Sequence, residues 1–249
     1  MKNILIILVG LLVVPGVLTA QDSPDRWRLE VEGGVVLPGY NTVQVPNPGG
    51  TRFSLRNDLD IDSRAYARLR LSWRFASRHE ISLLYAPLSV NANGVLPEMI
   101  RFDEVLFPAG EAVEALYRFN SYRLTWRWHW VRKPKVDLWV GFTAKIRDAE
   151  IRLKSNERES FTDNVGFVPL FHLRMVWRWG DRMGMIVEAD AAAAKQGRAE
   201  DVAAILFWKP GAKTQLRLGY RFVEGGADVE QVYNFAFIGY VFAGAAIHF

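Results

Sequence analysis

The chain has 249 residues and a mass of 28.3 kDa, and 50% of its residues are apolar. Its formal net charge is +4, and its lysines and arginines are interleaved with aspartates and glutamates, which argues against nucleic-acid binding. Cysteine is absent, which excludes disulfides, thiolate metal sites and cysteine nucleophiles.

The first segment of the chain has the pattern of a secretory signal peptide. Lys2 supplies a positive charge, residues 4–14 are apolar, and Ala20 is a small residue before the expected cut. We therefore expect residues 1–20 to be a signal peptide and residues 21–249 to form one domain. The alternative is a retained N-terminal anchor. No later apolar run reaches the roughly 18 residues of a spanning helix, so a membrane-embedded domain would have to cross as strands.

Alternation of apolar and polar residues predicts strands along the first half of this domain. The clearest strand covers residues 63–75, where Leu69, Leu71 and Trp73 share one face and four arginines share the other. A helix would scatter these arginines around its circumference. The same pattern predicts strands over residues 26–37, 80–90, 111–130 and 136–153, with long loops over 38–60 and 91–110. Apolar residues change parity near Asn120, which predicts a β-bulge there.

The second half of the domain continues the pattern. We expect strands over residues 161–179, 183–193, 200–209, 213–223 and 229–249, with loop-like links at 195–198 and 224–228. The links after alternate strands are short, whereas several of the others are long, as in outer-membrane barrels with short periplasmic turns and longer external loops. All nine tryptophans then fall toward one rim, where an aromatic girdle is expected at a membrane interface.

The last predicted strand carries a more specific pattern. Nearly all odd-numbered positions from Val229 to Phe249 are apolar, and the chain ends with Gly244, Ile247 and Phe249 in fixed spacing. This ending resembles the C-terminal signal strand of bacterial outer-membrane β-barrels. Phe242 departs from the pattern, because those proteins usually have a polar residue there. The resemblance implies recognition by the barrel-assembly machinery through Gly244, Ile247 and Phe249, and it indicates no single family.

These observations predict an all-β fold, namely a transmembrane antiparallel up-and-down β-barrel of about ten strands. Barrels of eight or twelve strands, and a soluble periplasmic β-domain, are the alternatives. We expect a location in the outer membrane of a Gram-negative cell envelope, with outer-membrane lipid as surroundings, no nucleic-acid partner and no cofactor. The sequence does not indicate the oligomeric state.

The predicted register points many charged residues into the lumen. A ten-stranded barrel has a narrow interior that its own side chains largely fill. We interpret the charges as an ion-pair network that plugs the barrel; the alternative is a porin-like path for an anionic solute. The candidate residues are Arg64, Arg68, Arg70, Arg74, Arg123, Arg127, Lys145, His172, Arg174, Glu188, Asp190, Arg217 and Arg221.

Catalysis and metal binding have little support in the sequence. His172 is the one histidine predicted to point inward at mid-strand, and a general base also needs an orienting carboxylate and a nucleophile. No motif of the omptin proteases or of lipid A-modifying enzymes is present. The acidic run Asp58–Asp62 lacks the features of a calcium loop. We therefore expect a structural or passive-transport barrel without catalytic or metal site; an outer-membrane enzyme and a surface adhesion or partner-binding barrel are the rival interpretations.

Overall fold

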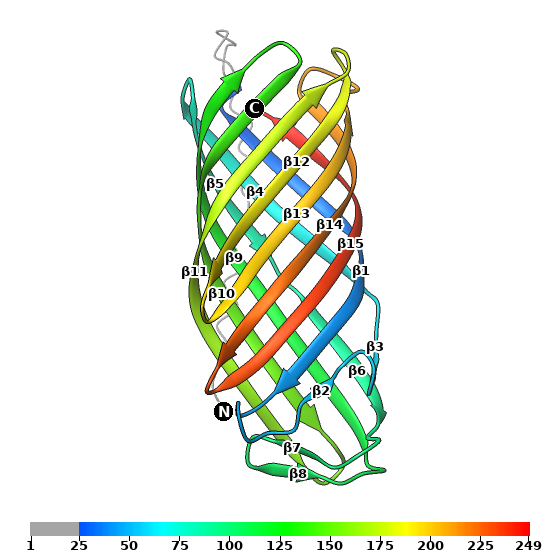
Figure 1. The fold of residues 1–249 in the computed structure, drawn as a ribbon. Coiled ribbons are helices and arrows are strands. Elements are labelled where there is room, and N and C mark those ends of the chain that lie inside the picture. The colour runs from blue at the N-terminus through cyan, green and yellow to red at the C-terminus, as the bar shows by residue number, and fades with distance from the viewer. Residues whose placement is uncertain (1–24) are drawn as a thin grey trace, which may run out of the picture.

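The computed structural model describes residues 25–249, and the predicted signal peptide lies outside them. The described chain is built from antiparallel strands, and the long ones wind around a closed barrel (Figure 1). Among these residues no helix is long and apolar enough to cross a membrane. The strands are β1 (Trp27–Gln44), β2 (Phe53–Ser54), β3 (Asp60–Ile61), β4 (Arg64–Ala76), β5 (His79–Ala86), β6 (Ser89–Val95), β7 (Ile100–Phe102), β8 (Val105–Phe107), β9 (Ala112–Arg132), β10 (Val136–Lys154), β11 (Glu159–Arg178), β12 (Met183–Ala194), β13 (Gly197–Trp208), β14 (Thr214–Val229) and β15 (Val232–His248).

The barrel closes because each long strand pairs with its neighbours in sequence and β15 pairs with β1. β5 and β6 form one barrel strand interrupted at residues 87–88, since both pair with consecutive parts of β9. With this pair counted once, the barrel has ten strands, which confirms the predicted fold and strand number.

The two ends of the barrel differ. At one end, here called the turn end, the strands are joined by residues 77–78, 133–135, 179–182 and 209–213. At the opposite end, the loop end, the long connections after β1 and β6 contain the small strands β2, β3, β7 and β8 (Figure 1). β9, β10 and β11 have 21, 19 and 20 residues, whereas β12 and β13 have 12 each, so the wall is taller along β9–β11.

Several strands reach further toward the loop end than predicted. β1 continues past Pro38 to Gln44 because a register shift between Pro38 and Asn41 accommodates the proline. β14 continues through the predicted loop at 224–228. Gly225 has a φ of +147°, and a Cβ on Gly226 would lie 1.9 Å from the carbonyl oxygen of Asn234. These glycines therefore permit close strand pairing and do not mark a turn. β13 likewise begins at Gly197, before the predicted start at residue 200.

The predicted β-bulge near Asn120 is wrong. β9 pairs with β10 in unbroken register from Ala115 to His129, and the shift lies between Leu138 and Trp139. Val113, Ala115 and Tyr117 lie on the same face of β9 as the inward residues that follow them, and all three are buried in the interior. The apolar residues change face because the interior itself changes from polar to apolar along the barrel.

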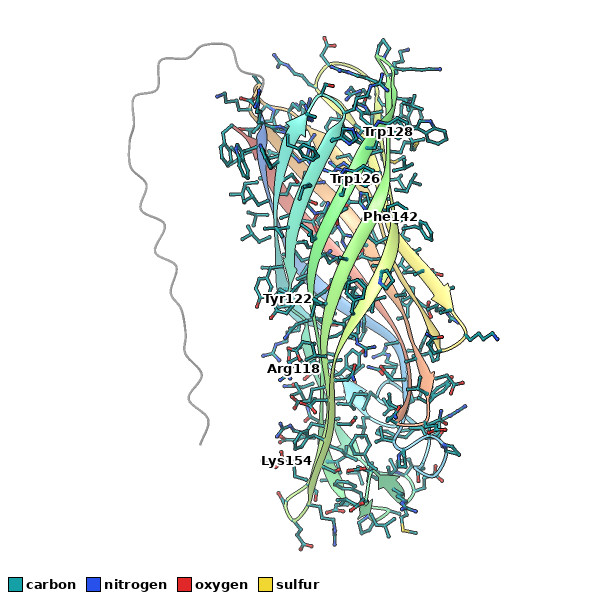
Figure 2. The ribbon with its side chains drawn as sticks, turned by 90° about the vertical axis from the view of Figure 1, so that its left-hand side faces the viewer. Arg118, Tyr122, Trp126, Trp128, Phe142 and Lys154 are labelled. Carbon is teal, nitrogen blue, oxygen red and sulfur yellow. The ribbon has the colours of Figure 1, made fainter. Side chains whose placement is uncertain are left out.

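The outer surface carries an apolar band that ends at the tryptophans. All nine tryptophans lie toward the turn end, but Trp139 is buried inside the barrel against His129 and is not part of the outer band. Figure 2 shows Trp126, Trp128 and Phe142 near the turn end, with Tyr122, Arg118 and Lys154 successively nearer the loop end. Five strands each contribute to this band a residue that is 46–58% exposed: Val31, Leu69, Leu83, Phe142 and Leu218. Toward the loop end the outer surface becomes charged, where Arg118 lies 2.7 Å from Glu150 and Arg198 lies 2.7 Å from Glu224. Such a band between aromatic and polar zones fits lipid on the outside of the wall.

The interior is filled in two layers. The loop half contains a buried apolar core that includes Val43, Phe102, Phe107 and Leu153, each with 0% exposure. Phe102 and Phe107 come from the connection between β6 and β9, so this connection packs into the barrel end. The middle of the barrel is charged, and it contains most of the candidate residues.

Candidate functional site

The charged lumen is built by strand register, which sets opposite charges beside each other on neighbouring strands. Glu30 of β1 lies opposite Arg70 of β4, and Arg174 of β11 lies opposite Glu188 of β12. The strand alternation then turns these side chains inward. We call the following fifteen charged residues the lumenal network: Arg28, Arg68, Arg70, Arg123, Arg127, Lys145, Arg174, Arg217, Arg221, Glu30, Glu32, Glu80, Glu188, Asp190 and Asp201.

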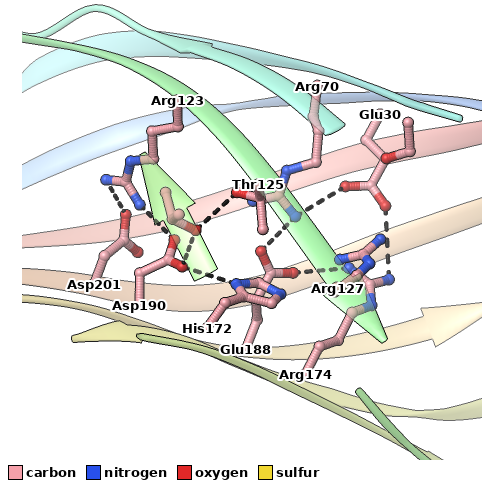
Figure 3. Close-up of polar contacts among 12 residues, drawn as sticks. Glu30, Arg70, Arg123, Thr125, Arg127, His172, Arg174, Glu188, Asp190 and Asp201 are labelled. Carbon is pink, nitrogen blue, oxygen red and sulfur yellow. Dashed lines mark hydrogen bonds and ion pairs between the residues drawn. The ribbon is translucent and has the colours of Figure 1, made fainter. Parts of the chain in front are cut away.

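Glu30 is the centre of the part of the network nearer the turn end. Its carboxylate lies 2.8 Å from Arg28, 3.1 Å from Arg217 and 3.6 Å from both Arg70 and Arg174. Glu188 joins the same group, because Arg174 donates to it at 2.7 Å and Arg70 also contacts it (Figure 3). Glu30 is 2% exposed, so its charge is balanced by these guanidinium groups and not by bulk water.

Asp201 is the corresponding centre nearer the loop end. Arg221 donates to its carboxylate at 2.6 Å, Arg123 lies 2.7 Å away and Arg68 donates at 3.3 Å. Arg123 also donates to Asp190 at 2.8 Å, which links the two aspartates (Figure 3). Three arginines thus share the carboxylate of Asp201. Each guanidinium therefore keeps N–H donors that Asp201 does not accept.

His172 is held within this polar layer. Its Nδ1 lies 2.8 Å from Asp190, and the Thr143 hydroxyl donates to the same carboxylate oxygen at 2.7 Å. The threonine thus contacts the aspartate, and among the described residues no hydroxyl is hydrogen-bonded to the imidazole. His172 is 4% exposed, so its ring is enclosed within the polar layer.

The structure separates two of the sequence candidates from the others. Arg64 lies at the start of β4 and is exposed, and Arg74 lies near the turn end with 40% of its side chain exposed, 3.8 Å from Glu80. The remaining candidates are buried together in the middle of the lumen: Arg68, Arg70, Arg123, Arg127, Lys145, His172, Arg174, Glu188, Asp190, Arg217 and Arg221.

The predicted register also turns the carboxylates Glu30, Glu32 and Asp201 inward, but sequence reasoning missed four other members of this site. Arg28 and Glu80 contact each other at 2.8 Å, and the hydroxyls of Thr125 and Thr143 lie 2.8 Å apart beside Asp190. Each of the four alternates with outward apolar residues, so strand parity was the signal that could have identified them. Arg118, which the bulge would have turned inward, is on the outer surface beside Asp148 and Glu150.

The network carries more cations than carboxylates. Its nine cations and six carboxylates all have side chains no more than 11% exposed. Lys145 is 3% exposed, and among the described residues no carboxylate lies within 4.0 Å of its ammonium group. It lies instead 4.6 Å above the ring of Phe119. The lumenal network is therefore positively charged overall, while Asp137, a further buried carboxylate near the turn end, is paired with His129 and Arg178.

The residues of the proposed assembly signal are part of the barrel seam. Ile247 points outward with 48% exposure, and the backbone of Phe249 exchanges two hydrogen bonds with Trp27, at 2.8 and 3.0 Å. A Cβ on Gly244 would lie 2.3 Å from the Val31 carbonyl oxygen, so glycine allows β15 to approach β1. Phe242 points inward, where its ring is buried 5.8 Å from the guanidinium of Arg221.

Comparison with known proteins gives the same fold. The sequence matches no protein-family model and no curated protein. The outer membrane protease OmpT from Escherichia coli is structurally similar, with a TM-score of 0.61 over 93% of this chain and 99% of that one, at 11% identity. The fold is that of a bacterial outer-membrane β-barrel.

Two other outer-membrane proteins align over nearly their full length but less closely. The COG4313 outer membrane channel from Pseudomonas putida F1 gives a TM-score of 0.46 at 11% identity, covering 95% of this chain and 100% of that one. The attachment invasion locus protein Ail of Yersinia pestis gives 0.40 at 9% identity, covering 90% and 99%. At 11% identity, the similarity to OmpT shows the fold and does not indicate an activity for this barrel.

Proposed function

We propose that this protein is a closed, non-catalytic scaffold barrel of the bacterial outer membrane, which does not conduct solutes. The observation that supports the proposal is the burial of inward side chains in both interior layers. Phe102 and Phe107 are 0% exposed in the apolar layer, and the side chains of Arg217 and Arg127 are 0% and 2% exposed in the charged layer. A water-filled pore would leave the side chains that line it accessible to solvent.

The two layers contribute differently to such a scaffold. The apolar core resembles that of a soluble domain, in which burying one large side chain stabilises the fold by about 1.5–3 kcal/mol. The ion pairs contribute less net stability, since desolvation offsets much of their attraction. They do penalise wrong registers, because a one-residue slip of a strand would turn its charges toward lipid. We infer that the network specifies the register of a barrel whose membrane-facing band is apolar and would itself discriminate poorly between registers.

The non-catalytic part of the proposal follows from the surroundings of His172. Its carboxylate partner, Asp190, is shared with Arg123 and Thr143, and all these groups are enclosed by the barrel wall. A catalytic His–Asp pair needs an adjacent nucleophile or water and a route for substrate. We therefore assign the pair a structural role in joining β10, β11 and β12.

Single-channel recording in planar bilayers tests the closed lumen. The refolded protein should give no discrete conductance steps, while a water-filled porin in the same bilayers provides the positive control. Insertion is verified independently by heat-modifiable migration of the recovered protein. Discrete steps with anion selectivity would contradict the proposal and favour passive transport. In that case the double variant Arg68→Gln, Arg70→Gln should show weaker anion selectivity than the wild type.

One observation favours a second role, binding of a partner at the loop end. Met99 and Leu106 are 59% and 53% exposed in the connection that covers the loop end, and Val95 at the end of β6 is 60% exposed (Figure 1). Exposed apolar side chains beyond the membrane band suit a protein contact. If this connection mediates adhesion, the double variant Met99→Glu, Leu106→Glu should assemble normally but reduce cell–cell or surface adhesion. Unchanged adhesion by equally expressed cells would contradict this role.

A further inference from the structure

A small cavity lies where the charged layer meets the apolar layer. Its volume is about 20 Å³. Arg68, Ser121 and Arg123 line it from the charged layer, and Leu88 and Tyr240 line it from the apolar layer. This space is enough for one particle of about the size of a water molecule.

Two hydrogen-bond donors on residues that line the cavity have no partner among the described residues. They are the hydroxyl of Tyr66 and the Nε of Arg68, both of which are buried. Arg68 as a whole is 5% exposed, so bulk water does not satisfy it. Ser121 adds a third donor, because its oxygen accepts from Arg123 at 2.9 Å and its own hydrogen is left to donate. Buried donors without acceptors destabilise the folded state, so this arrangement requires an acceptor in the cavity.

The charge around the cavity identifies the kind of acceptor. Arg68 and Arg123 share the carboxylate of Asp201 with Arg221. Lys145 is buried, with its ammonium group 4.6 Å from the ring of Phe119, and Phe119 also lines the cavity. Six carboxylates face nine cations in the lumenal network as a whole. A water molecule could accept the free hydrogen bonds, but it would leave this excess positive charge uncompensated among buried side chains.

We propose that this cavity binds one small monovalent anion of the halide class, such as chloride. The ion would accept from Tyr66, Arg68 and Ser121 and would compensate part of the positive charge. Phosphate and sulfate are excluded because they are much larger than the cavity. The site goes beyond the proposed scaffold role, since a closed barrel without the ion would also be non-conducting.

Anion-dependent unfolding of the full-length protein in detergent tests the site. Sodium chloride is exchanged for sodium gluconate at constant ionic strength, because gluconate is monovalent but too large for the cavity. Chloride should raise the unfolding midpoint in a saturable way and increase the folding equilibrium constant about 100-fold at 100 times its dissociation constant. Equal midpoints in the two salts would overturn the proposal.

A matched pair of variants removes general salt effects. Tyr66→Phe deletes one donor at the cavity while it keeps the ring, and it should shift the chloride titration to at least tenfold higher concentration. Tyr122→Phe deletes a hydroxyl from the outer surface, where this side chain is 43% exposed, and it should leave the titration unchanged. A chloride response of Tyr66→Phe equal to that of the wild type would refute the assignment.

Crystals of the wild-type protein grown in sodium bromide provide a measurement that does not depend on folding of the variant. The proposal requires an anomalous bromide peak within hydrogen-bond distance of the Tyr66 hydroxyl and the Arg68 Nε. Density at that position without an anomalous signal would show a water molecule and would overturn the proposal.

Discussion

A substitution of Leu69 tests the membrane band directly. Leu69 is 46% exposed on the outer face of β4, opposite Val31 and Tyr85 on the neighbouring strands. Trp73, four residues further along, marks the girdle at the turn end. At about 3.4 Å per residue the two lie about 13 Å apart along the strand, and a tilt of about 40° reduces this to about 10 Å of depth. In an apolar band about 25 Å tall, Leu69 is therefore close to the middle.

Leu69→Arg should consequently destabilise the barrel by about 2–4 kcal/mol, the cost of a cation facing lipid near the midplane. Leu106→Arg is the matched control, because Leu106 is similarly exposed at 53% but lies beyond the band at the loop end. There we expect a change within about 0.5 kcal/mol. The free energy of unfolding is measured by denaturant titration in phospholipid vesicles. Equal effects of the two substitutions, or the larger effect at Leu106, would refute the placement of the membrane.

Three further predictions concern the interior and the seam. Asp201→Asn should destabilise the barrel by about 3–5 kcal/mol, because three arginines lose the carboxylate that they share. Asp163→Asn, at an exposed position, is the control, and equal denaturation midpoints of the two variants would contradict this prediction. Phe107→Ala should cost about 3–5 kcal/mol through loss of a fully buried ring, and a change below about 1 kcal/mol would mean that the apolar layer is not packed in solution. Deletion of Phe249 should leave the protein secreted but poorly inserted, as measured by heat-modifiable migration; normal migration and yield would count against the assembly signal.

The wall of the barrel could be predicted from the sequence because its period is simple. Leu69 and Arg70 alternate between lipid and lumen, and this alternation extends over whole strands. The tryptophans added an independent indication of one membrane interface. Where the predicted strands were too short, glycine and proline were the cause: Gly225 and Pro38 were interpreted as loop residues but lie inside strands. Composition alone does not distinguish a turn glycine from one that allows two strands to approach.

The interior was less accessible to prediction, since its contacts join distant parts of the chain. The alternation around Val113 and Tyr117 suggested that these side chains face lipid. Both lie instead in an apolar core that Leu55 and Phe102 from the loops complete. Neither the inward folding of these loops nor the choice of partners for Asp201 follows from local pattern. The excess of cations could be predicted from parity, whereas the cavity beside Arg68 depends on tertiary packing.

The pairing of Trp27 with Phe249 has a consequence for the order of folding. Residues near the two ends of the described chain form one seam, so closure is the most non-local contact in the molecule. Contacts of this kind form slowly, because a very long loop of chain must be ordered first. Until β15 is in place, β14 and β1 both expose unpaired backbone groups that can join with another chain. Incomplete barrels are thus prone to aggregation, and a cell gains by holding them in a protected state until the last strand arrives.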